Sequence, residues 1–144
     1  MLYTVILFAH IISAILSIGP FFVLFPLLRR MEGASDAVLQ SQIETFRSAI
    51  RLVKHAGHVL VASGVLLIWQ GYWPWSTSWI IMTLAVMFGS VFFLARAFKP
   101  TLRKFEQPGI DRGNLLKKLN RSVWVYIFLL SVMLWLMVAK PQIW

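Results

Sequence analysis

One histidine stands alone inside a long apolar segment near the start of the chain. His10 lies within residues 3–28, which contain no Asp, Glu, Lys or Arg, and Ser13 and Ser17 follow three and seven residues later. In a helix these spacings place the three side chains on one face. Polar groups are costly in hydrocarbon, so residues of this kind are usually functional. We predict cofactor binding by His10, Ser13 and Ser17, with His10 as the metal ligand.

Other roles stay open for the same histidine. A hydrogen bond to a neighbouring helix that only stabilises packing is one alternative, and proton relay or substrate contact is another. If His10 binds a metal, the ring nitrogen that faces away from it should donate a hydrogen bond that fixes the tautomer. Ser13 or a backbone carbonyl is the expected acceptor.

The other two histidines lie near the start of another apolar segment. His55 and His58 are three residues apart, a spacing that could hold a metal, but a metal site needs a third ligand. We take His55 as an interfacial titrating group and His58, one turn deeper, as a second cofactor-binding candidate. Helix rise places His10 and His58 at depths that differ by about 10 Å, so we do not expect them to share one ion.

The elements that carry these residues are four long apolar segments, at about 3–28, 56–73, 79–98 and 122–139. The chain of 144 residues is 59% hydrophobic and 13% charged, whereas a soluble domain has about 25% charged residues. Each segment approaches the roughly 20 apolar residues that a spanning helix needs. The sequence therefore predicts an all-α fold: a single membrane domain over residues 1–144, built as a four-helix transmembrane bundle in the lipid bilayer.

The basic residues predict the orientation of the bundle. Thirteen of the fourteen Lys and Arg residues lie in or beside the loops 29–55 and 99–121, and only Lys140 lies on the other side. The positive-inside rule then places both loops in the cytoplasm and both termini outside. The net charge of +9 is explained by this orientation, so no nucleic-acid partner is expected. The opposite interface is marked by aromatic residues, namely Trp69, Tyr72, Trp73, Trp75 and Trp79.

Patterns within the loops and segments predict how the helices begin and pack. Apolar residues spaced by three and four from Leu39 to Val53 indicate an amphipathic helix that continues into the second span and lies against the bundle or at the lipid surface. Ser35 or Asp36 is its expected N-cap and Asn114 that of the last helix, and a turn is expected at 107–109. Small residues should mark close helix contacts within the bundle or a homodimer interface; they are Gly57, Gly64, Gly71, Ala85 and Gly89.

Several classes of chemistry have no support in the sequence. There is no cysteine, and all five acidic residues lie in the loops rather than in the spans. An ion pump or proton-coupled carrier normally needs an intramembrane carboxylate, so a small transporter is disfavoured. No phosphate-binding loop, nucleophile elbow or His-Glu-x-x-His motif occurs. The six methionines form no cluster along the chain, which gives copper binding little support.

The chain resembles a group of small bacterial four-helix membrane proteins. The carrying residues are His10-Ile11-Ile12, Gly19, Phe21-Phe22 and Pro26, then Arg103-Lys104-Phe105, Leu119-Asn120 and Val138-Ala139-Lys140-Pro141. The group includes a predicted integral membrane protein family, the copper-resistance protein D domain and the haem-dependent membrane protoporphyrinogen oxidase of bacteria. The resemblance implies an inner membrane location and haem b binding at His10. The oxidases carry a lysine and a histidine in helix three and Asn-Glu before helix four, where this chain has Thr83, Phe93 and Asn120-Arg121.

Two functional hypotheses of different class follow. The first is a haem-binding or redox-associated membrane protein that uses His10. The second is a non-enzymatic accessory or structural subunit that docks a membrane partner protein through its bundle and basic loops. The sequence contains no complete set of catalytic residues, so it favours a non-enzyme without deciding the matter.

Overall fold

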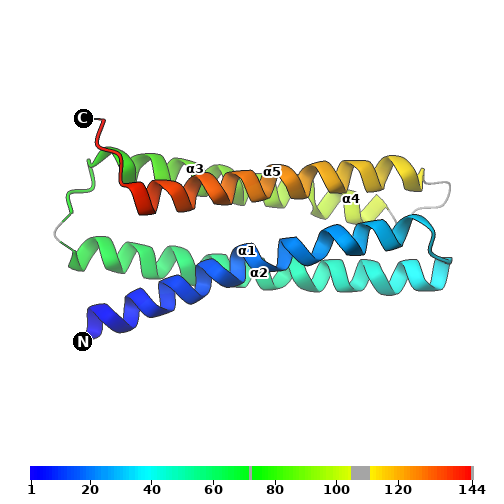
Figure 1. The fold of residues 1–144 in the computed structure, drawn as a ribbon, viewed down its shortest axis with the longest axis horizontal. Coiled ribbons are helices and arrows are strands. Elements are labelled where there is room, and N and C mark those ends of the chain that lie inside the picture. The colour runs from blue at the N-terminus through cyan, green and yellow to red at the C-terminus, as the bar shows by residue number, and fades with distance from the viewer. Residues whose placement is uncertain (72, 105–110, 144) are drawn as a thin grey trace.

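The computed structural model describes residues 1–71, 73–104 and 111–143, and these form five helices (Figure 1). They are α1 (Leu2–Glu32), α2 (Asp36–Gln70), α3 (Ser78–Ala97), α4 (Lys99–Lys104) and α5 (Arg112–Ala139). The described part of the chain contains no strand. Four helical stretches are long and apolar enough to cross a membrane: Leu2–Glu32, Asp36–Gln70, Ser78–Lys104 and Arg112–Ala139. The prediction of an all-α protein with four spanning helices is confirmed. Tyr72 and the turn predicted at 107–109 lie outside the described residues.

The helices pack as two antiparallel pairs. Helix α1 packs along α2 and α3 packs along α5, while α1 and α5 join the two pairs. Figure 1 shows both termini at one end of the bundle, beside the connection between α2 and α3. We call this the aromatic end, because Trp73, Trp75 and Trp79 lie there. The other end holds the turn at 33–35 and α4, and we call it the basic end.

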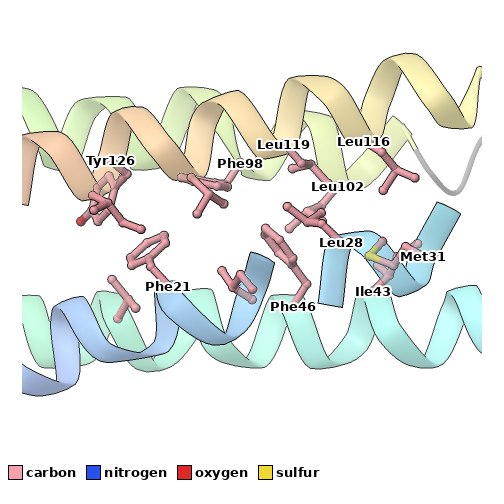
Figure 2. Packing of buried hydrophobic residues seen from close by; sticks show 14 of the residues in the cluster. Phe21, Leu28, Met31, Ile43, Phe46, Phe98, Leu102, Leu116, Leu119 and Tyr126 are labelled. Atoms are coloured by element: carbon pink, nitrogen blue, oxygen red, sulfur yellow. The ribbon is translucent and has the colours of Figure 1, made fainter. Parts of the chain in front are cut away.

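The hydrophobic core lies toward the basic end. The face predicted for the amphipathic part of α2 is confirmed, since Leu39, Ile43, Phe46 and Val53 are buried and Ile50 packs against them. The sequence left open whether this segment packs against the bundle or lies at the lipid surface. In the structure it packs against the bundle. Figure 2 shows aromatic side chains from the two helix pairs meeting in the core. In contrast, no residue before Ser13 is buried, so the pairs are less closely packed at the aromatic end.

Side chains fix where the helices begin at the basic end. Ser35, one of the two predicted caps, accepts a hydrogen bond from the Val38 amide at 3.4 Å. The prediction of Asn114 as the cap of the last helix is wrong. That helix begins earlier, so Asn114 is already its third residue. The backbone amide of Asn114 donates to the Asp111 carboxylate at 3.3 Å. Arg112 then ties the start of α5 to the turn after α1, because its guanidinium donates to the Ala34 carbonyl at 2.6 Å.

Candidate functional site

His10 lies on α1 and faces α2 and α5. Its Nδ1 atom is 3.1 Å from the Leu60 carbonyl oxygen and 2.9 Å from the Ser63 hydroxyl, both on α2. Its Nε2 atom is 3.5 Å from the Met137 sulfur on α5. The histidine therefore bridges the two helix pairs in the half of the bundle that the core does not fill.

The partners of Nδ1 indicate the tautomer of the ring. A carbonyl oxygen can only accept, so Nδ1 carries the proton and donates to Leu60. The Ser63 hydroxyl donates to the Val59 carbonyl at 2.7 Å, which leaves its oxygen free to accept from Nδ1 as well. Nε2 then holds the lone pair of the neutral imidazole and faces Met137. The predicted acceptors were Ser13 and a backbone carbonyl. In the structure the carbonyl fixes the tautomer, and Ser13 does not take part.

A cavity of about 630 Å³ opens beside His10, between the two helix pairs. Its wall is mostly apolar and includes residues from α1, α2, α3 and α5, such as Ala14, Val61, Leu84 and Leu134. The few polar groups on it are His10, Thr83, Lys140 and the aromatic residues Tyr3, Trp73 and Trp79. Small-molecule sites are typically cavities of this size with an apolar lining and a few polar groups.

Three methionines line the same cavity. Met87 comes from α3, and Met133 and Met137 are one turn apart on α5. The folded chain thus gathers half of the six methionines around His10, although they are scattered along the sequence. Thioether sulfur is a soft ligand for transition metals, so imidazole and sulfur donors meet here. Among the described residues, no group of three or more His, Asp or Glu side chains could hold a metal.

The other predicted site residues lie elsewhere. Ser13 and Ser17 are buried, but each hydroxyl donates to a carbonyl of its own helix, Ser13 to Ala9 and Ser17 to Ser13. Neither serine lines the cavity. His58 is exposed on α2 and does not line the cavity, and its ring centre is 6.4 Å from that of His55. The structure therefore brings neither the serines nor His58 into the site of His10.

Two residues that were not predicted as ligands from the sequence complete the site. Ser63 shares the Nδ1 proton of His10, and Met137 faces Nε2. Ser63 could have been recognised from the sequence, because it is a hydroxyl residue inside the second apolar segment, next to Gly64. Met137 carried no signal in the sequence, since a methionine in an apolar helix is ordinary.

Two of the positions that differ from the oxidases lie in different surroundings. Thr83 lines the cavity, and its hydroxyl donates to the Trp79 carbonyl at 2.6 Å. Phe93 packs in the core, with its ring centre 6.3 Å from that of Phe98. An amine is therefore missing from the cavity wall at the position where the oxidases carry lysine.

These features define a small polytopic membrane protein with a ligand-sized cavity that opens between two helix pairs and has one histidine on its wall. Residues 4–107 match the family described as "Predicted integral membrane protein (DUF2269)", and the chain belongs to it. No curated protein and no solved structure matches the chain.

Proposed function

We propose that the chain is a redox-associated membrane protein that binds haem b in the cavity, with Nε2 of His10 as the iron ligand. The observation that carries the proposal is the pair of contacts made by the imidazole. Nδ1 is held by the Leu60 carbonyl at 3.1 Å, while Nε2 faces the other helix pair. Histidines that bind metals almost always donate their second ring N–H to a carbonyl, a carboxylate or water.

The residues around Nε2 fit this cofactor. The wall is apolar and its volume of about 630 Å³ is of the size that cofactor sites have. The Met137 sulfur, 3.5 Å from Nε2, is a ligand type found with histidine on haem iron. Met137 would offer its sulfur as a second ligand, and its three rotatable bonds would let the side chain make room for the cofactor.

The chemistry would come from the cofactor, and the chain would hold and shield it. Haem supplies one-electron chemistry when it is bound. His10 would bind and orient it, the apolar wall would exclude water, and the Leu60 carbonyl would keep the imidazole in one tautomer. Thr83 stands where the oxidases carry lysine, so we propose electron transfer or haem handling rather than the oxidase reaction.

The proposed orientation places the cavity at the outer face of a bacterial inner membrane. Its support is the distribution of charge, with thirteen of the fourteen basic residues in or beside the loops 29–55 and 99–121 and the aromatic residues at the other end. Cytoplasmic loops carry an excess of Lys and Arg. In this orientation both termini and Lys140 are outside.

Single cysteines test the orientation, because the chain has no native cysteine. Ser76→Cys and Gln142→Cys, both exposed at the aromatic end, should react with an impermeant thiol reagent in intact cells. Gly33→Cys at the basic end should react only after the cells are lysed; the position tolerates a side chain, since a Cβ there would meet no atom within 4 Å. The reverse labelling pattern would invert the proposed orientation.

Replacing His10 by alanine tests the haem proposal. The protein purified in detergent from cells supplied with a haem precursor should show a Soret band, and His10→Ala should abolish it, because the alanine offers no ligand. Absorption spectra of equal amounts of both proteins are the measurement. His55→Ala and His58→Ala are the controls and should leave the band unchanged, since neither ring lines the cavity. A wild-type protein without a Soret band would refute the haem proposal.

A further inference from the structure

A single lysine lies at the mouth of the cavity. Lys140 lines the cavity and is exposed at the aromatic end, where the sequence places no other Lys or Arg. The ion pairs of the described residues, Arg47 with Glu44 and Arg112 with Asp36, both lie toward the basic end. No described carboxylate therefore neutralises the Lys140 ammonium.

The fold holds this lysine in a defined place. Its backbone has φ 49°, and it is the one non-glycine residue with positive φ among the described residues. The segment after it is fastened to the start of α3, because the buried Ser78 hydroxyl donates to the Pro141 carbonyl at 2.9 Å and accepts from the Ile143 amide at 3.0 Å. The ammonium lies 5.5 Å from the ring centre of Trp73 and 5.6 Å from that of Trp79. Attraction to the α5 dipole accounts for a cation at this helix end, and cation–π attraction accounts for its approach to two rings of the cavity wall.

A buried donor without an acceptor lies next to this lysine. The Trp79 side chain lines the cavity and is 9% exposed, and its indole Nε1 has no hydrogen-bond partner. An unpaired buried N–H destabilises the fold, so such a group calls for an explanation. Trp79 is also the second residue of α3, whose N-terminus carries a partial positive charge. The ammonium, the indole N–H and the helix end each favour an anion, and the ammonium lies 5.6 Å from the centre of the ring that carries the N–H.

We propose that Lys140 and Trp79 form an anion subsite that binds the carboxylate of an amphipathic ligand whose apolar body lies in the cavity. Two charge-assisted hydrogen bonds of about 2.8 Å to one carboxylate can bridge an ammonium and an indole whose ring centre is 5.6 Å away. Trp73, which packs against the Trp79 ring, is exposed, so its side chain can move aside and let the head group reach Nε1 beside the Lys140 ammonium. The inference rests on the proposed function where the ligand is haem b, which carries carboxylates on one edge, but it does not require iron.

A carboxylic acid and its methyl ester, which lacks the negative charge, are compared to test the subsite. Haem b and its dimethyl ester are titrated into the detergent-purified protein, and dissociation constants are obtained from absorbance. The wild type should bind the free acid about tenfold more tightly, as expected for a hydrogen bond between charged groups. Lys140→Gln should abolish this preference, Lys140→Arg should retain it, and Trp79→Phe, which keeps a ring but removes the N–H, should reduce it. Lys99→Gln at the basic end is the control and should leave the preference unchanged.

The outcomes separate this inference from the haem proposal. Equal binding of the acid and the ester by the wild type, or a preference that survives in Lys140→Gln, would overturn the subsite while leaving haem binding intact. If neither porphyrin binds, the haem proposal fails, and palmitate and methyl palmitate are compared in its place. A preference for palmitate that Lys140→Gln removes would support the subsite, and the lack of any preference would overturn it.

Discussion

Replacing Phe98 by alanine should lower the free energy of unfolding by about 3–5 kcal/mol, the usual effect of removing a large aromatic side chain from a packed core. Phe98 is 0% exposed, and its ring centre lies 6.0 Å from those of Phe21 and Phe46 and 6.1 Å from that of Tyr126. These neighbours come from α1, α2 and α5, as Figure 2 shows. The deletion would therefore leave a cavity where three helices meet, and unfolding in mixed detergent micelles would measure the loss.

A phenylalanine in the same spanning stretch, Ser78–Lys104, provides the control. Phe88 is 67% exposed and packs against lipid rather than protein in a membrane. Phe88→Ala should change the unfolding free energy by less than about 0.5 kcal/mol, as surface substitutions usually do. Equal effects of the two substitutions would show that the aromatic cluster does not hold the bundle together.

Replacing Gly64 by leucine should lower the unfolding free energy by about 1–3 kcal/mol and also disturb His10, because extra side-chain volume in a close contact forces neighbours to move. A Cβ at Gly64 would lie 3.2 Å from Cε1 of the His10 ring, tighter than ordinary contact. The rest of the leucine side chain would push the imidazole away from Leu60 and Ser63. Thermal unfolding in detergent measures the first effect, and the Soret absorbance of the haem-loaded protein measures the second.

Gly57 is the matched control for this substitution. It lies seven residues earlier on the same helix, and a Cβ there would meet no atom within 4 Å. Removing a glycine from a helix interior favours the helix at both positions, so a difference between the variants reports on the contact with His10. A Gly64→Leu protein as stable as Gly57→Leu, with an unchanged spectrum, would mean that the ring has room to move.

The helices were predictable because their signals are local. An apolar run, a capping serine and a face that repeats every three to four residues are read from neighbouring positions, and the face from Leu39 to Val53 became part of the core. The packing of small residues was less predictable. The expectation of a bundle contact holds for Gly64. It is wrong for Gly57, where an added Cβ would meet no atom within 4 Å, and for Ala85 and Gly89, which are exposed on α3. Spacing shows that two residues share a face, but not which face another helix covers. A homodimer contact through these three residues stays a prediction.

The candidate site was predictable at its centre and not in its surroundings. His10 stood out because it is polar within an apolar segment. The meeting of His10 with Ser63 and Met137 depends on how α1 crosses α2 and α5, and contacts across 53 and 127 residues of sequence leave no local pattern. The same holds for Met87 and Met133, whose common position beside the cavity follows only from the packing of α3 on α5.

Helix α2 is longer than the membrane is thick, so this protein folds partly in lipid and partly in water. Its 35 residues extend over about 52 Å at 1.5 Å per residue, whereas the hydrocarbon layer is about 30 Å thick. A third or more of the bundle therefore stands in the head-group region and in water, and in the proposed orientation this is the basic end that contains Leu39, Ile43 and Phe46. There, burial removes apolar surface from water and drives assembly. Around the cavity, lipid solvates the outer faces of the helices as well as protein does, so no such force draws the two pairs together.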